Sequence, residues 1–220
     1  MAQTRAADTT PQRLILAAER LFAERGIEGV TVRDITSEAG ANTAAMHYHF
    51  GSKEALLRAV LMHRGAELAA RREALLDRVE RARRPTIRMV VEALVVPTAE
   101  LAADDEHGGR YYVGFLAALL DHPEHLHLID EVFDEQIGRY LAAVARVTPG
   151  LDDEVRALRF GLAKDFVNRA LASPGRGVRL WVETHAPATL PELTEHVVDF
   201  LVGAFAAPCR TPRVRAADGR

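Results

Sequence analysis

Cysteine is nearly absent from this sequence of 220 residues, in which Cys209 is the only one. A single cysteine cannot form a disulfide within the chain, so the composition argues against a disulfide-stabilised extracellular fold. No run approaches the 18 apolar residues of a membrane-spanning helix, and the first residues lack the apolar stretch of a signal peptide. We therefore expect a cytoplasmic protein with no membrane contact.

The alternating pattern of a β-strand is missing too, apart from residues 177–183, which could form a short extended segment. Apolar residues instead recur every three or four positions, and this spacing predicts an all-α fold. Glycine and proline divide the pattern into segments. Helices are expected at about 11–25, 32–39, 43–50, 53–79, 85–103, 108–121, 123–147, 151–172 and 191–206.

Several of these helices have recognisable ends. Thr10 is expected to cap the first helix, with Pro11 at its first position. Thr31 and the acidic residue three places on, Asp34, form the pattern of a capping box. Asn42 and Ser52 are placed to cap the third and fourth helices. Pro97 should kink or break the fifth helix, because it removes a backbone hydrogen bond at Ala93.

The net charge of −3 does not favour a nucleic-acid binder, but the charge is unevenly distributed. Residues 1–53 are neutral and 54–84 carry +3, whereas 85–149 carry −7, which permits DNA binding by the first part of the chain. The sequence divides into an N-terminal arm with the first three helices (1–52), a connecting helix (53–84), a second helical domain (85–207) and a flexible tail (208–220).

Two histidines, His47 and His49, flank Tyr48 in the third helix. Residues two apart on a helix point about 200° apart, so this pair cannot bind one metal ion there, although on a strand it could. Met46 and Phe50, four apart, share a face that would anchor the helix to the core. The glycine turn before it suggests a helix-turn-helix, whose second helix reads DNA.

Other interpretations remain open. The two histidines could be solvated residues at a helix end, and a small helical enzyme or metal-binding protein could use the histidine-rich segments. In residues 121–127, His122 and His125 could share a face with Asp121 or Glu124 as metal ligands. Surface histidines at a helix start are commoner than metal sites, so we expect no metal, no cofactor and no catalytic residue.

From about Pro11 to Leu61 the sequence resembles the DNA-binding domain of the TetR (tetracycline repressor) family of bacterial transcriptional regulators. The resemblance is carried by Ala17-Ala18, Leu21-Phe22, Gly26, Thr31-Val32, Ile35, Ala39-Gly40, Met46, Tyr48, Phe50, Ser52-Lys53 and Leu56-Leu57. It implies an all-α homodimer with a three-helix helix-turn-helix domain and a helical ligand-binding and dimerisation domain. Its partners would be a palindromic double-stranded DNA operator and a small hydrophobic or amphipathic effector that releases the DNA.

Carried over by position, the DNA-contacting residues are Thr31, Asn42, Thr43, Ala44, His47, Tyr48, His49 and Lys53. Helix N-termini and a lysine suit phosphate, while a hydroxyl or a methyl group at the start of the recognition helix suits base edges. The family commonly has tyrosine directly after the apolar residue, where this sequence has His47. Histidine is therefore expected to donate to phosphate or base in its place.

The same resemblance predicts a four-helix dimer interface formed by the last two helices and their copies. Two apolar stripes fit it, and their residues are Leu158, Leu162, Phe166, Val197, Leu201 and Phe205. The alternative is that these stripes pack only within one chain. A ligand pocket is expected near Pro97, Tyr111, Phe115, Phe133 and Phe160, although a place in the core is the commoner role for each of these aromatics.

Overall fold

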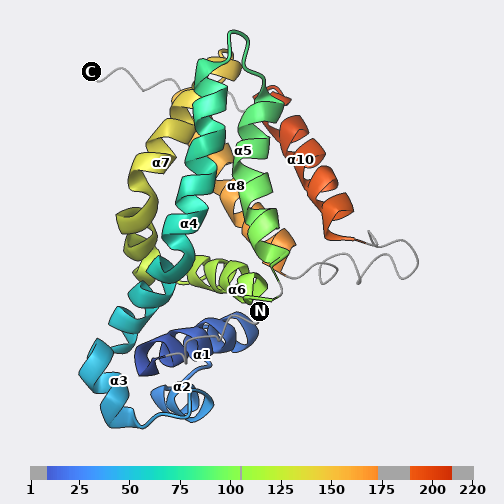
Figure 1. Cartoon of the computed structure of the whole chain (residues 1–220). Helices are drawn as coiled ribbons and strands as arrows, with labels where there is room; N and C mark the ends of the chain where they lie inside the picture. The colour runs from blue at the N-terminus through green and yellow to red at the C-terminus, as the bar shows by residue number, and fades with distance from the viewer. Residues whose placement is uncertain (1–8, 105, 173–188, 210–220) are drawn as a thin grey trace, which may run out of the picture.

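The computed structural model describes residues 9–104, 106–172 and 189–209. Every regular element in these ranges is helical, which confirms the all-α prediction (Figure 1). The elements are α1 (Thr10–Arg25), α2 (Val32–Glu38), α3 (Thr43–Phe50), α4 (Lys53–Arg81), α5 (Ile87–Ala102), α6 (Gly109–Leu120), the short 3-10 helix η1 (Pro123–His125), α7 (Leu126–Val147), α8 (Asp153–Ala172) and α10 (Leu190–Ala206). The predicted extended segment at 177–183 lies outside the described residues.

The predicted caps explain where most of the first helices begin. The side chains of Thr31, Asn42 and Ser52 each accept a hydrogen bond from the backbone N–H three residues on. The first cap was misplaced by one residue, because Thr9 and Gln12 form the capping box of α1 while Thr10 is already helical. Local hydrogen bonding thus fixes these ends.

Helices α1, α2 and α3 pack into a small three-helix unit at one end of the molecule (Figure 1). Phe22, Ile35 and Met46, one from each helix, are fully buried in its centre. Gly40, at φ +58°, makes the turn between α2 and α3, and only glycine adopts this conformation readily. The turn sets α3 across the end of the unit.

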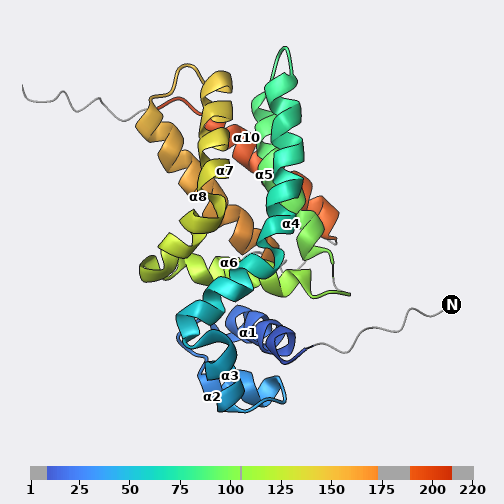
Figure 2. The ribbon, with the colours of Figure 1, turned by 60° about the vertical axis from the view of Figure 1, so that its left-hand side comes forward.

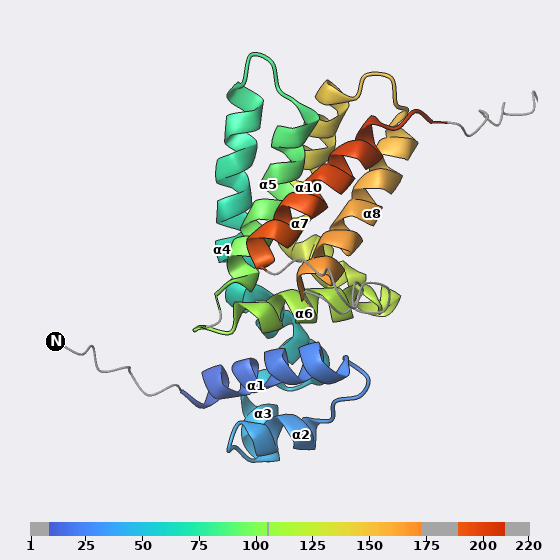
Figure 3. The same cartoon turned by 90° about the vertical axis from the view of Figure 1, so that its right-hand side faces the viewer.

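Helix α4 leaves this unit and runs the length of the second domain, where it packs against α5 and α7 (Figures 1 and 2). Helix α6 lies crosswise beneath the other helices and rests on α1 (Figure 3). Gly114 allows this close approach, because a Cβ there would lie 2.9 Å from the Cβ of Ala23. The two parts of the chain therefore meet at α1 and α6 as well as through α4.

Pro97 does not break α5, which continues from Ile87 to Ala102. The carbonyl of Ala93, which loses its usual donor at Pro97, accepts a hydrogen bond of 2.6 Å from the Tyr140 hydroxyl. A side chain of α7 thus replaces the missing backbone bond. Among the described helices, none is both long enough and apolar enough to cross a membrane.

Candidate nucleic-acid interface and interior cavity

One face of α3 is buried and the other is open to solvent. Met46 has no exposed surface and Phe50 packs against the core, as predicted from their spacing. Thr43, Ala44 and His47 are exposed, and the Tyr48 side chain is 85% exposed. An aromatic ring left this far in solvent on a firmly anchored helix is available for contact with another molecule.

Two of the predicted contact residues already use their polar groups to cap helices. The Asn42 side chain accepts a hydrogen bond of 2.7 Å from the Ala45 N–H. Thr31 donates its hydroxyl to a carboxylate oxygen of Asp34, and these hydrogen bonds lower the pKa of Asp34. Since Asp34 therefore stays ionised, it would repel a phosphate at the start of α2. Thr31 is consequently a weaker candidate than the sequence suggested.

Lys53 and His47 are also partly engaged within the chain. The Lys53 ammonium donates to the carbonyl of Ile27 at 2.6 Å and lies 5.8 Å from the Phe22 ring centroid. Nδ1 of His47 lies 3.2 Å from the carbonyl oxygen of Gly51. This contact occupies one of the two ring nitrogens, and Nε2 is the one that remains for DNA.

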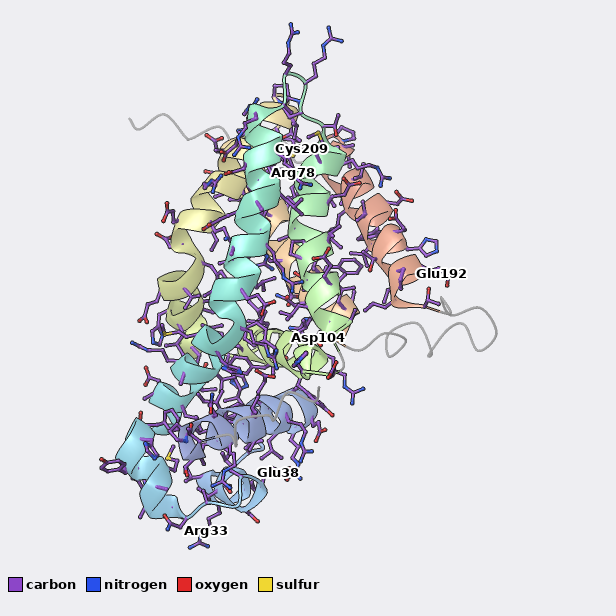
Figure 4. All side chains as sticks on the ribbon, in the orientation of Figure 1. Arg33, Glu38, Arg78, Asp104, Glu192 and Cys209 are labelled. Carbon is purple, nitrogen blue, oxygen red and sulfur yellow. The ribbon has the colours of Figure 1, made fainter. Side chains whose placement is uncertain are left out.

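Arg33, which the sequence analysis did not select, is the more accessible cation. It lies at the foot of the three-helix unit and points away from the protein (Figure 4). It is exposed and forms no ion pair among those found in the described residues. Its place in the first turn of α2, beside the predicted contact Thr31, could have singled it out.

The second domain contains an interior cavity bordered by five helices, α4 to α8. Its walls are mostly aliphatic and aromatic, and they include two of the candidate pocket residues, Phe133 and Phe160. The other predicted pocket residues lie elsewhere: Pro97 is buried inside α5, and Phe115 packs against Phe22 with ring centroids 6.0 Å apart. Tyr111 borders an open hollow beside α1. Pro97 and Phe115 therefore line none of the pockets found in the described residues, whereas Tyr111 lines a hollow other than this cavity.

Polar residues that the sequence analysis did not select also line this cavity: Arg72, Gln136, Tyr140, Lys164 and Asn168. One signal was available in the sequence. Arg64, Leu68, Arg72 and Leu76 follow one another at intervals of four, and all four are buried. An arginine within an apolar stripe is a buried cation that needs an explanation.

Two sequence models match most of this architecture. Residues 14–60 match the model described as bacterial regulatory proteins, tetR family. Residues 92–204, more than half of the chain, match the model of the tetracyclin repressor-like C-terminal domain. The chain belongs to the TetR family. It is accordingly a DNA-binding transcriptional regulator of the helix-turn-helix type.

Curated relatives align over the DNA-binding end. The HTH-type transcriptional repressor Rv3405c of Mycobacterium tuberculosis is 38% identical over 84 residues, which are 37% of this chain and 45% of that protein. A repressor named AcnR from Corynebacterium glutamicum is 40% identical over 58 residues, 26% of this chain and 31% of its own. The matched part thus spans less than half the length of these curated relatives.

Solved structures share the fold of this TetR-family chain over nearly its whole length. FadR from Bacillus subtilis, solved in complex with stearoyl-CoA, is 18% identical with a TM-score of 0.59, covering 86% of this chain and 96% of its own. KstR2 of Mycobacterium tuberculosis, described as a ketosteroid transcriptional regulator, is 19% identical with a TM-score of 0.59, covering 90% and 96%. At such identities the likeness establishes the fold alone.

The predicted dimer residues fall into two groups. On α8, Leu158 and Leu162 are 63% and 62% exposed, and Phe166 is exposed beside them. On α10, the stripe Val197, Leu201 and Phe205 is buried against the chain's own core. This corrects the prediction for α10, whose exposed aromatic is Phe200 instead, with its ring centroid 4.9 Å from that of Phe166.

The histidine-rich segment contains one arrangement with metal-ligand spacing. Among the described residues, Glu28, His122 and Glu124 have ligand atoms within 4.8 Å of one another. The two carboxylates are exposed, and exposed acidic groups commonly gather without a metal. His125, the predicted partner of His122, is outside this group, although their ring centroids are 6.1 Å apart.

Proposed function

We propose that this regulator is a repressor that binds a palindromic operator as a homodimer and releases it when a small molecule enters the C-terminal domain. It would act in the cytoplasm, with residues 1–52 reading DNA, 53–84 connecting, 85–207 binding the effector and the partner subunit, and 208–220 forming a tail. The observation that carries the proposal is the exposed face of α3. Burial of Met46 on the opposite face of this helix keeps the exposed face turned toward solvent.

The proposed DNA contacts are the eight residues named from the sequence, of which Thr31 is the weakest candidate, joined by Arg33. Ala44 and Thr43 begin the recognition helix and would meet base edges, as a methyl group and a hydroxyl can. Tyr48 and His49 are exposed and would reach the sugar-phosphate backbone. Arg33 supplies an exposed positive charge for the phosphates of DNA, which matters because the N-terminal segment as a whole is neutral.

The proposed dimer interface is formed by the exposed apolar residues Leu158, Leu162 and Phe166 of α8 with Phe200 of α10. Helices α8 and α10 lie side by side in the second domain (Figure 3), and the rings of Phe166 and Phe200 meet between them. A contiguous exposed patch of large apolar side chains is typical of an interface with another protein. A second copy would bury it in a two-fold contact and set the distance between the two recognition helices.

Effector control requires that the second domain move the first. The contact of α1 with α6 is close-packed at Gly114 and Ala23, and α4 continues from the DNA-binding domain into the wall of the cavity. A ligand that favours a conformation with displaced α4 or α6 would weaken DNA binding, and DNA would weaken ligand binding equally.

DNA binding is tested with the purified protein and a labelled fragment from its own upstream region, over a series of salt concentrations. We expect salt-sensitive binding that Arg33→Ala weakens, with the slope of log Kd against log salt reduced by about 1. Arg78→Ala is the matched control, since Arg78 is an exposed helical arginine at the far end of α4 (Figure 4). Absence of a preference for any palindromic fragment would overturn the proposal.

The dimer is tested by sedimentation of Leu162→Glu, which places a charge in the proposed interface. We expect a folded monomer that binds the palindrome at least tenfold more weakly, because a buried unpaired charge costs several kcal/mol. Met62→Glu is the control, an equally exposed apolar residue on α4. A Leu162→Glu protein that stays dimeric would exclude this face.

A further inference from the structure

Arg72 projects from α4 into the interior cavity, where no carboxylate of the described residues forms an ion pair with it. It is 9% exposed, and Nη2 donates to the Thr98 hydroxyl at 3.1 Å. The guanidinium lies 5.6 Å from the centre of the Phe133 ring, but its Nε has no hydrogen-bond partner among the described residues. Burial of a cation in this way is costly unless an anion accompanies it.

The acidic groups nearest to Arg72 are two tyrosines, and they do not supply that anion. Burial raises the pKa of both Tyr112 and Tyr140, so both phenols stay neutral. Each hydroxyl also donates to a backbone carbonyl, Tyr112 to Leu61 and Tyr140 to Ala93. Desolvation by burial lowers the pKa of Arg72 itself, and the opposing influence of Tyr140 and Tyr112 is smaller.

A second cation enters the cavity from α8. Lys164 is partly buried there, and burial together with repulsion from Arg72 lowers its pKa, although Asp130 of α7 opposes this. One turn further along α8, the buried Oδ1 of Asn168 has no hydrogen-bond partner among the described residues. The cavity thus brings together two cations and two unsatisfied polar atoms.

The remaining walls are apolar. Leu94, Leu116, Leu120 and Ile129 line the cavity with Phe133 and Phe160, while Gln136 is satisfied by its bond of 2.9 Å to the carbonyl of Ala69. The space that water can reach is about 40 Å³. That is enough for a carboxylate or a few waters, since one water needs roughly 10–15 Å³. A ligand with an apolar body would have to part the surrounding helices.

We propose that this cavity binds an organic monoanion, a carboxylate with an apolar body, whose charge is neutralised by Arg72 and Lys164. The inference rests on the proposed effector function of the second domain and names the class of effector. The carboxylate accepts hydrogen bonds from the guanidinium of Arg72 and the ammonium of Lys164. Such bonds are strong because both the donor and the acceptor are charged. The body wedges between α4, α7 and α8, and this links binding to movement of α4.

The test compares acids with neutral alcohols of the same shape: octanoate with 1-octanol, and benzoate with benzyl alcohol. Dissociation constants for the purified full chain are measured by calorimetry at pH 7.5. We expect at least one acid to bind about 10- to 100-fold more tightly than its alcohol, the discrimination that a buried charge-assisted hydrogen bond provides. Equal binding of acid and alcohol, or no binding by either acid, overturns the inference.

Variants identify the residues responsible. Arg72→Met should abolish the preference for acid over alcohol, and Lys164→Met should reduce it. Lys164→Met also provides a second measurement if Arg72→Met does not fold. Arg71→Met is the control, because the neighbouring Arg71 pairs with Glu67 and Glu100 at the surface. Retention of the preference in both cavity variants, or its loss in the control, contradicts the assignment.

Two further measurements separate the possible failures. Sodium formate, which lacks an apolar body, should raise the melting temperature less than octanoate does; an equal rise would mean that the site binds any small anion, against the proposal. DNA binding is measured on the same samples without ligand. Intact DNA binding without acid binding removes only this inference, whereas absent DNA binding removes the proposed function.

Discussion

Arg64 and Arg72 lie two turns apart on the same buried stripe of α4, and their surroundings are opposite. Arg64 meets Glu19 of α1, with Nε 3.3 Å from both carboxylate oxygens, and also donates to the backbone carbonyl of His107. Arg72 meets a hydroxyl, an aromatic ring and a cavity. The same residue type therefore ties two domains together at one site and remains without a counter-charge at the other.

A buried arginine that has a carboxylate partner within the chain, as Arg64 has, acts differently from one that has none among the described residues, as at Arg72. The Glu19–Arg64 pair joins α1 to α4 and to the segment before α6, so it stabilises the orientation of the DNA-binding domain. Arg72 forms no ion pair within the described residues, and the anion that we propose for it is a ligand, so this site can respond to what binds there. Breaking each site separately should give different results.

The largest effect is expected from Glu19→Ala, which leaves Arg64 buried without its carboxylate. Removal of one partner of a buried pair typically costs about 3–5 kcal/mol of unfolding free energy. Urea denaturation at pH 8 measures it. The control is Glu38→Ala, which breaks the surface pair with Arg20 and should cost less than about 1 kcal/mol. Equal losses in the two variants would show that the buried pair has no special role.

The next effect is a pH dependence carried by Glu19. Burial raises the pKa of Glu19 from 4.5 to about 7, against the opposing influence of Arg64. Because the folded-state pKa is the higher one, protonation of Glu19 adds stability that is complete below pH 4.5 and lost as the pH rises through about 7. Above that pH the ionised carboxylate still pairs with Arg64, and the alanine variant removes this pairing. The slope is at most about 1.4 kcal/mol per pH unit.

The experiment compares urea denaturation of the wild type and Glu19→Gln between pH 5 and 8. The free energy of unfolding of the wild type, relative to the variant, should fall over this range. Asp77 and Asp121, whose pKa values are lowered by Arg139 and Arg169, act in the opposite direction at lower pH and cancel in the difference. A constant difference between the two proteins would mean that Glu19 is ionised throughout.

A smaller effect is expected at the helix contact beside this pair. Gly114→Ala would place a Cβ 2.9 Å from Ala23, and overpacking of this kind costs about 1–3 kcal/mol. Gly138→Ala in α7 is the control, because nothing lies within 4 Å of its added Cβ and alanine favours a helix by about 1 kcal/mol. The melting temperature should fall for Gly114→Ala and rise for Gly138→Ala. DNA affinity should change only for Gly114→Ala.

The smallest change in stability is expected for Arg72→Met. Replacing a buried charge that has no partner by an apolar side chain is often neutral or stabilising, so we expect a change within about 1 kcal/mol. Urea denaturation without ligand measures it, in direct contrast to Glu19→Ala. A loss as large as that of Glu19→Ala would mean that Arg72 is a structural residue, held in place by Thr98 and Phe133.

The first 60 residues were predictable because their determinants are local. Asn42 and Ser52 cap helices through hydrogen bonds that span three residues, and Met46 lies buried where its spacing from Phe50 placed it. Lys53 was predicted to bind phosphate, but its ammonium also donates a hydrogen bond to the carbonyl of Ile27, 26 residues away. The contact between Lys53 and Ile27 depends on how α1 and α4 cross, and the spacing of residues along the sequence does not predict that crossing.

The sequence by itself determined the helices, their caps and the family resemblance, because periodicity and capping act over a few residues. Only the tertiary structure decided that Val197 faces inward while Phe200 faces outward, since both faces of α10 carry apolar residues. It likewise decided that Arg64 meets Glu19, whereas Nε of Arg72 has no hydrogen-bond partner in the part of the chain that the structure describes. The partner of a buried charge is distant in the sequence, and helix packing alone selects it.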